Sequence, residues 1–281
     1  MKNLATFYDH ILEIAKQERV SAGEALEEAA RLGIAWVEVS YANAQADPRT
    51  LAGELARRGL GVSAMPAFFD FGQNPDVEAQ AAPVLEAAEV LGAKTLLVIP
   101  GFWAGDEAGR PAQTEAMLVG VERLGGLADR RGIRLVMEEF DNAASPIATL
   151  EGLGRFLDRC PGLMACFDTG NFRFAAQDER EACRVLAART GHVHLKDRRL
   201  TPEFGGDSLT ALDGAVLYPS PVGGGVIRME EILRRLKAAG YQGLYTIEHY
   251  GAAPMLDCLR RSAEWARGKI EPSTQPESGP K

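Results

Sequence analysis

Short apolar segments alternate with amphipathic segments along almost the whole chain, and this alternation constrains the fold most. The apolar segments are rich in Val, Ile, Leu and Tyr and have the length of buried strands. The segments between them carry Ala, Leu, Glu and Arg at helical spacing. Strict alternation predicts a parallel sheet, and about eight such units predict closure into a single (β/α)8 TIM barrel of the α/β class. The expected strands cover 4–7, 35–40, 60–65, 94–100, 133–138, 163–168, 192–196 and 244–248.

The ends of the expected helices agree with this fold. Three helices end in a glycine directly before the next strand, at Gly33, Gly92 and Gly240. Glycine is the usual residue at such a position because it adopts the left-handed backbone conformation without steric cost. An open doubly wound sheet is the alternative, but no GxGxxG motif follows the first strand.

The composition does not change from one unit to the next, so we expect one barrel domain over residues 1–270. The 281 residues suit this size, since such barrels often run to about 250 residues. Residues 198–227 form one long connection rich in Gly and Pro, which we expect to be functional or mobile. The polar, proline-containing stretch 271–281 is expected to be a disordered C-terminal tail.

Charge and cysteine content exclude several classes of protein. The formal net charge of -8 disfavours nucleic acid as a partner, because binding to phosphates relies on basic residues. The four cysteines form no CxxC pair, which indicates reduced thiols and a cytoplasmic location. The N-terminal segment lacks the apolar region of a signal peptide, and no apolar stretch could span a membrane. A homo-oligomer remains open.

Four polar residues stand at the ends of consecutive apolar strands. They are Glu138, Asp168, His194 and Glu248, one on each of the fifth to eighth expected strands. In a barrel, these strand ends meet at the C-terminal face, where active sites lie. Three carboxylates at close range repel one another unless a cation lies between them. We therefore expect one divalent metal ion, with manganese, magnesium or cobalt favoured by the oxygen-rich donors and zinc as an alternative.

The motifs around these positions resemble a known family. The segments "GIRLVMEEFDN", "CFDTGNF", "HVHLKD" and "GLYTIEHY" are similar to those of the sugar phosphate isomerase/epimerase superfamily, the xylose-isomerase-like barrels. The resemblance covers about residues 20–265. It implies that the same four residues, listed above, bind one metal ion. It also implies that Glu138 and Glu248 act as the catalytic acid and base.

The chain departs from this resemblance at two positions. Many family members carry a histidine three residues after the metal-binding aspartate, where this chain has Asn171. Epimerases carry an arginine six residues after the metal-binding histidine, where this chain has Leu200. Arg198 and Arg199 are adjacent to that position. Both departures weaken the epimerase interpretation relative to other activities of the superfamily.

Further residues are candidates for binding a substrate. Lys196 shares the alternating strand face of His194 and would lie near the barrel rim. Apolar walls for a sugar ring could come from Phe102 and Trp103 and from the "PAFFDFG" segment at 66–72. The predicted substrate-binding set is Asn171, Lys196, Arg198, Glu38 and Trp103.

The expected chemistry starts with removal of a proton beside a carbonyl. A metal ion would polarise a hydroxy-ketone and stabilise an enediolate, while a carboxylate moves the proton. The favoured interpretation is an isomerase or epimerase of a small sugar or keto-sugar in carbohydrate metabolism. A lyase of the inosose dehydratase type and a non-catalytic metal-binding or sugar-binding barrel are the alternatives. A DNA-repair endonuclease that shares this fold by family resemblance needs many histidines to bind a three-metal cluster. The chain has only four histidines, which argues against that function.

Overall fold

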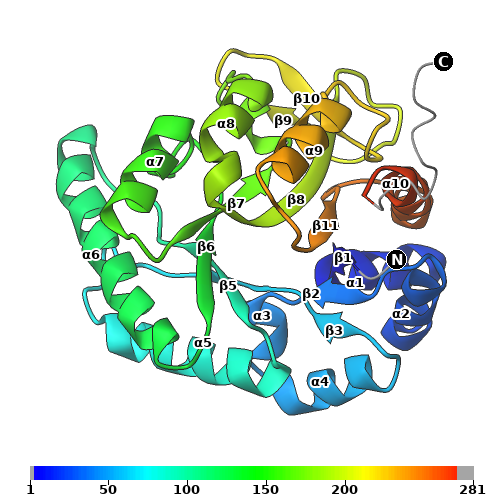
Figure 1. Cartoon of the computed structure of the whole chain (residues 1–281), viewed down its shortest axis with the longest axis horizontal. Coiled ribbons are helices and arrows are strands. Elements are labelled where there is room, and N and C mark those ends of the chain that lie inside the picture. The colour runs from blue at the N-terminus through cyan, green and yellow to red at the C-terminus, as the bar shows by residue number, and fades with distance from the viewer. Residues whose placement is uncertain (1–2, 271–281) are drawn as a thin grey trace, which may run out of the picture.

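The computed structural model describes residues 3–270, and the predicted tail at 271–281 lies outside the described residues. Its strands surround a central axis and its helices lie outside them (Figure 1). The strands of the barrel are β1 (Leu4–Phe7), β2 (Trp36–Glu38), β3 (Gly61–Val62), β4 (Met65–Phe68), β5 (Thr95–Ile99), β6 (Arg134–Met137), β7 (Met164–Asp168), β8 (Thr190–Arg199) and β11 (Tyr245–Glu248).

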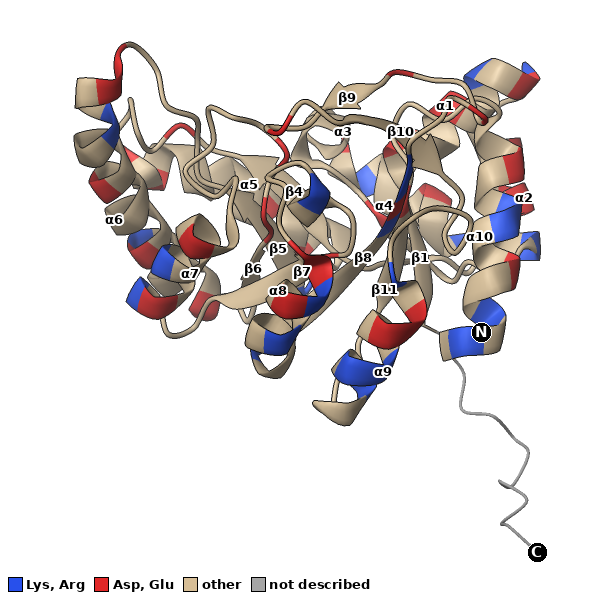
Figure 2. Cartoon of the chain, turned by 90° about the horizontal axis from the view of Figure 1, so that it is seen from above, with Lys and Arg blue, Asp and Glu red and all other residues tan. Residues whose placement is uncertain are grey.

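The helices follow the strands in the order that the alternation predicts. Charged residues are frequent along these helices, as the blue and red segments of the ribbon show (Figure 2). No helix within residues 3–270 combines the length and the apolar character that a membrane span requires. The helices are α1 (Tyr8–Glu18), α2 (Ala22–Arg31), α3 (Tyr41–Ala44), α4 (Pro48–Ala56), α5 (Val77–Leu91), α6 (Arg110–Asp129), α7 (Leu150–Arg159), α8 (Glu179–Leu186), α9 (Met229–Ala238) and α10 (Met255–Ile270).

Parallel pairing runs around the barrel. The strand β1 pairs with β2 on one side and with β11 on the other, and the remaining neighbours follow in the order β11, β8, β7, β6, β5 and β4. The predicted TIM barrel is thus confirmed. The predicted strand at 60–65 is corrected, because it is divided into β3, which pairs with β2, and β4, which pairs with β5. Ser63 and Ala64 lie between these two strands and still hydrogen-bond to the segment of β2, because the N–H of Ser63 donates to the oxygen of Val37 and the N–H of Val39 donates to the oxygen of Ala64.

Helix ends follow the expected local chemistry. Gly33, Gly92 and Gly240 all have positive φ, at 84°, 74° and 89°. Ser21 begins α2 with a capping box, in which its hydroxyl accepts a hydrogen bond from the backbone N–H of Glu24 while the Glu24 carboxylate accepts one from the Ser21 N–H. These residues end and begin helices at the places where the chain turns towards the next strand.

The long connection at 198–227 differs from a structureless loop. It contains β9 (Leu209–Thr210) and β10 (Val216–Ser220), and β10 pairs antiparallel with the end of β8. For this reason β8 continues beyond the predicted strand end at 196. The carboxylate of Asp197 accepts hydrogen bonds from the backbone N–H groups of Gly223, Gly225 and Ile227, which ties the connection to the barrel.

The apolar side chains form two clusters. The larger cluster lies between the strands and the helices and extends from Leu4 to Ile270. The smaller one, called here the interior cluster, consists of four buried residues. Its members lie on the strand faces opposite to those that contact the helices. The interior cluster is Leu97, Ile99, Val136 and Cys166.

Candidate metal centre

The alternation of side chains along the strands places the predicted ligands inside the barrel. Val136 belongs to the interior cluster, and Glu138 follows it by two residues. Cys166 belongs to the same cluster, and Asp168 follows it by two residues. Since alternate residues of a strand share a face, both carboxylates point into the barrel, one step nearer its C-terminal end.

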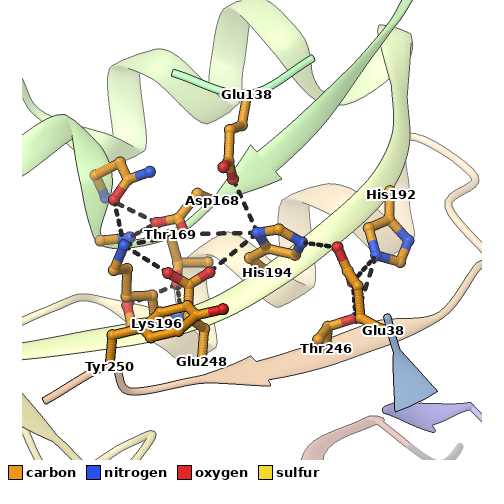
Figure 3. Close-up of polar contacts among 12 residues, drawn as sticks. Glu38, Glu138, Asp168, Thr169, His192, His194, Lys196, Thr246, Glu248 and Tyr250 are labelled. Carbon is orange, nitrogen blue, oxygen red and sulfur yellow. Dashed lines mark hydrogen bonds and ion pairs between the residues drawn. The ribbon is translucent and has the colours of Figure 1, made fainter. Parts of the chain in front are cut away.

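The four predicted ligands converge on one point (Figure 3). One donor atom from each lies within 4.8 Å of the others, and all four residues are buried. The Nδ1 atom of His194 lies 2.8 Å from an oxygen of Glu138 and 3.1 Å from an oxygen of Glu248. The same atom lies 3.8 Å from an oxygen of Asp168. The group therefore forms a compact ligand set contributed by four adjacent strands or strand ends.

These donor atoms suit a cation. Oε2 of Glu138, Oδ2 of Asp168 and Nδ1 of His194 are buried and have no hydrogen-bond partner within residues 3–270. Buried polar atoms normally have one, and a cation at their centre would satisfy all three. Three carboxylates and one imidazole fit a divalent ion such as manganese, magnesium or cobalt, and zinc also accepts these donors.

The electrostatics of the group point the same way. Burial raises the pKa of Asp168 well above its usual value, and the carboxylates of Glu248 and Glu138 add to this effect. Burial also raises the pKa of Glu138. Both carboxyl groups therefore hold their protons more tightly than exposed ones do, and a bound cation would reverse this by stabilising the ionised forms.

Lys196 lies beside this ligand set. Its ammonium Nζ is 2.6 Å from Oε1 of Glu248 and donates a hydrogen bond of 2.7 Å to Oδ1 of Asn171. Burial alone would raise the pKa of Glu248, but Lys196 holds it well below its usual value. The contact distinguishes the two glutamates, because it lowers the pKa of Glu248 whereas burial raises the pKa of Glu138.

A second buried group lies beneath the metal centre. The carboxylate of Glu38 accepts hydrogen bonds from Nε2 of His192 at 2.9 Å, from Nε2 of His194 at 3.1 Å and from Oγ1 of Thr246 at 2.8 Å. An ionised carboxylate only accepts hydrogen bonds, so Nε2 of His194 carries a proton. This contact fixes the ring so that Nδ1 faces the carboxylates and can bind a metal ion.

A cavity of about 740 Å³ opens above the ligand set. Glu138 and Glu248 form part of its floor, and Asp141, Asn171, Lys196 and Arg198 form a polar wall. The opposite wall is apolar. It consists of Pro66, Ala67, Phe68, Leu97 and Ile99. The cavity therefore presents metal-binding and charged groups on one side and hydrocarbon on the other.

Three of the predicted substrate-binding residues line this cavity, namely Asn171, Lys196 and Arg198. The side chain of Asn171 is engaged at both ends, because Nδ2 donates to the backbone oxygen of Glu139 and Oδ1 accepts from Lys196. Nη2 of Arg198 donates to Asp141, whereas its buried Nε has no partner. Their contact with substrate stays a prediction.

The other two predicted substrate-binding residues do not line the cavity. Glu38 lies beneath the metal centre, where it contacts histidines and not the cavity. Trp103 turns its Nε1 to Thr114 at 2.9 Å and packs against the larger apolar cluster. The sequence placed both residues at the correct end of a strand or just after it. It could not show that Glu38 lies below the ligands and that the ring of Trp103 turns outwards.

Sequence reasoning missed further lining residues, among them Asp141 and Tyr250. Asp141 accepts hydrogen bonds from both Lys196 and Arg198, at 3.4 and 2.7 Å. Tyr250 lines the cavity in the turn that follows β11. The sequence did offer an indication for Asp141, because it is an acidic residue three positions after the predicted ligand Glu138.

Comparison with known proteins bears on the family and the fold of the chain. Residues 26–269 match the family described as xylose isomerase-like TIM barrel. The chain belongs to this family. A curated relative, the inosose dehydratase of Geobacillus thermodenitrificans, is 28% identical over 140 residues, which cover 48% of this chain and 46% of that protein. The match therefore spans about half the length of that relative.

Solved structures of the same fold extend the comparison. A D-allulose 3-epimerase from Methylomonas sp., in complex with D-allulose, superposes with a TM-score of 0.72 at 14% identity and covers 95% of this chain and 96% of that chain. A xylose isomerase-like TIM barrel protein from Mycobacterium smegmatis, in complex with magnesium, has a TM-score of 0.66 at 20% identity and covers 88% and 87%. At these identities the likeness concerns the fold.

Proposed function

We propose that the chain is a divalent-metal-dependent isomerase or epimerase of a small sugar or keto-sugar. The observation that carries this proposal is the convergence of four ligand atoms within 4.8 Å on the floor of a cavity, with Lys196 in contact with one of the ligands. Two proteins named above support the proposal: a D-allulose 3-epimerase that shares the fold, and an inosose dehydratase that is similar in sequence over half of the chain.

The chain's own residues would divide the proton transfer between them. The Lys196 ammonium keeps Glu248 ionised, so Glu248 is suited to accept a proton from the carbon beside a carbonyl. Glu138, whose pKa is raised by burial, is suited to return one. A metal ion bound between them would supply the positive charge that stabilises an enediolate. Return of the proton to the same carbon gives an epimer, and return to the neighbouring carbon gives an aldose-ketose isomer.

A dehydratase is the second candidate, and one observation favours it. The inosose dehydratase relative matches half of the chain at 28% identity. Asn171 adds to this, since it occupies the position where many family members carry histidine and both ends of its amide contact the protein. Loss of a β-hydroxyl from the same enediolate would give dehydration.

Solvent exchange and absorbance distinguish these candidates. The manganese-loaded protein is incubated in D2O with D-fructose, D-tagatose, D-allulose and a keto-inositol. An isomerase or epimerase introduces deuterium at carbon beside the carbonyl, seen by proton NMR, whereas a dehydratase produces the ultraviolet absorbance of an enone. We expect Glu248→Gln to abolish either signal. If no substrate exchanges a carbon-bound proton and none is dehydrated, the proposed chemistry is wrong.

A further inference from the structure

Phe68 is unusual for a residue on a barrel strand. It lies at the end of β4, and 59% of it is exposed, although it lines the cavity above the metal centre. An exposed aromatic ring inside a cavity loses the favourable free energy that burial would provide. Its position therefore indicates a surface that a ligand covers.

Two other rings hold Phe68 in place. The ring centroid of Phe140 lies 5.8 Å away in an edge-to-face arrangement, and that of Phe102 lies 6.3 Å away with the rings nearly parallel. Phe102 and Phe140 also contact each other, at 5.6 Å. These separations are those that aromatic rings prefer. Phe102 and Phe140 thus hold the ring of Phe68 in position, and the exposed part of that ring is free to contact a ligand.

The part of the lining that β4 and β5 contribute contains no charged side chain. The residues that β4 and β5 contribute to the cavity are all apolar: Pro66, Ala67, Phe68, Leu97 and Ile99. The charged lining residues, such as Lys196 and Arg198, come from other elements. A free sugar carries hydroxyl groups around most of its ring, and those that face this wall would find no hydrogen-bond partner on it.

The size of the cavity adds a further argument. Its volume of about 740 Å³ is well inside the range of about 300–1,000 Å³ typical of sites for drug-sized ligands. A single small sugar bound at the metal centre would leave much of this volume, including the apolar wall, filled only with water.

We propose that Phe68, Phe140 and the apolar wall form a second subsite, which binds a flat apolar ring attached to the sugar-like part of the substrate. This inference rests on the proposed function, because it places the sugar-like part at the metal centre. The substrate class would then be a keto-sugar or related hydroxy-ketone that carries an aryl or similarly planar substituent.

A series of metal-chelating probes tests the subsite. Hydroxamates bind a divalent ion through two neighbouring oxygens, as a hydroxy-ketone would. We compare acetohydroxamate with benzohydroxamate and 3-phenylpropionohydroxamate, whose phenyl groups differ in reach, by calorimetric titration of the manganese-saturated protein. At least one aryl probe should bind about 10-fold tighter than acetohydroxamate or more, in line with the energy of an aromatic contact plus apolar burial.

Variants of the exposed ring provide the control. Phe68→Ala should reduce the advantage of the aryl probe to about 3-fold or less, because it removes the ring. Phe68→Trp should preserve the advantage, because it keeps an aromatic ring. Since the side chain is exposed, both variants should fold. Val185→Ala, on the exposed surface of α8, should leave it unchanged. Equal binding of alkyl and aryl probes, or an aryl advantage that survives Phe68→Ala, overturns the subsite alone. Failure of the protein to bind manganese, measured by electron paramagnetic resonance, overturns the proposed function and the subsite with it.

Discussion

Replacement of Glu38 by glutamine tests whether the group beneath the metal centre determines the state of His194. The substitution preserves shape, but it replaces one of two acceptor oxygens by an NH2 group. The carboxylate now accepts hydrogen bonds from His192, His194 and Thr246, all buried. In the variant, at least one of these three donors faces the NH2 group of the glutamine, which is itself a donor. His194 can avoid this by moving its proton from Nε2 to Nδ1, the atom that faces the ligand set.

The magnitude follows from the position of Glu38 behind a ligand. Changes to such supporting partners typically lower metal affinity by about 10–100-fold, the equivalent of about 1.4–2.7 kcal/mol. Burial alone would raise the pKa of Glu38, but His194 and His192 hold it well below its usual value, so the carboxylate is ionised at neutral pH. Folding stability should fall by about 1–3 kcal/mol for the donor left without a partner.

Titration with manganese and urea unfolding, both on the whole chain, measure these effects. Thr246→Val is the matched control, because it removes one hydrogen bond to Glu38 at 2.8 Å and leaves the proton of His194 in place. It should cost about 1 kcal/mol of stability and change metal affinity by less than about 3-fold. If Glu38→Gln is folded and binds manganese within about 3-fold of wild type, the argument that Glu38 sets the tautomer of His194 is refuted.

Four further outcomes can be measured. Asp168→Asn should lower manganese affinity at least about 100-fold in titration, because an anionic ligand is lost, without destabilising the metal-free protein, because burial disfavours the charge of Asp168 and the amide oxygen can still accept the hydrogen bonds from the backbone N–H groups of Gly170 and Asn171; marked destabilisation would contradict this. Manganese affinity should fall as the pH is lowered, with protons released on binding, because the raised pKa of Asp168 means that it must lose a proton first; a pH-independent affinity would contradict the raised pKa. Lys196→Met should abolish deuterium exchange, since Glu248 loses its ionic partner at 2.6 Å; an unchanged exchange rate would exclude this role. Asp197→Asn should cost about 1–3 kcal/mol in urea unfolding, because its buried carboxylate accepts backbone hydrogen bonds from the connection that follows β8; a cost near zero would show that the connection is held by other contacts.

Local sequence determined the elements of the barrel. Parallel strands covered by helices read as short apolar runs, so their number and order could be predicted from the sequence. The break between β3 and β4 could not, since it depends on how the chain at Ser63 and Ala64 fits between its two neighbouring strands. The hairpin of β9 and β10 carried a turn motif, Asp213-Gly214, and Gly214 has the positive φ of 85° that such a turn needs.

The convergence of the residues of the candidate metal centre was predictable for a similar reason. A strand ends at the C-terminal face of the barrel, and alternation decides which way its last side chain points. These two local facts placed Glu138, Asp168 and Glu248 together before any contact was known. The same reasoning put Glu38 and Trp103 near the site, but a strand pattern does not give depth along the barrel axis or the direction of a ring after the strand has ended.

The sequence by itself thus determined the barrel and the four residues at its rim, because both follow from the periodicity of single strands and helices. Only the tertiary structure decided the rest. It placed Glu38 behind His194, set Lys196 against Glu248 and divided the cavity into a polar wall and an apolar wall. Each of these depends on side chains from strands far apart in the chain, whose relative height is fixed by the stagger of the closed barrel and by no local pattern.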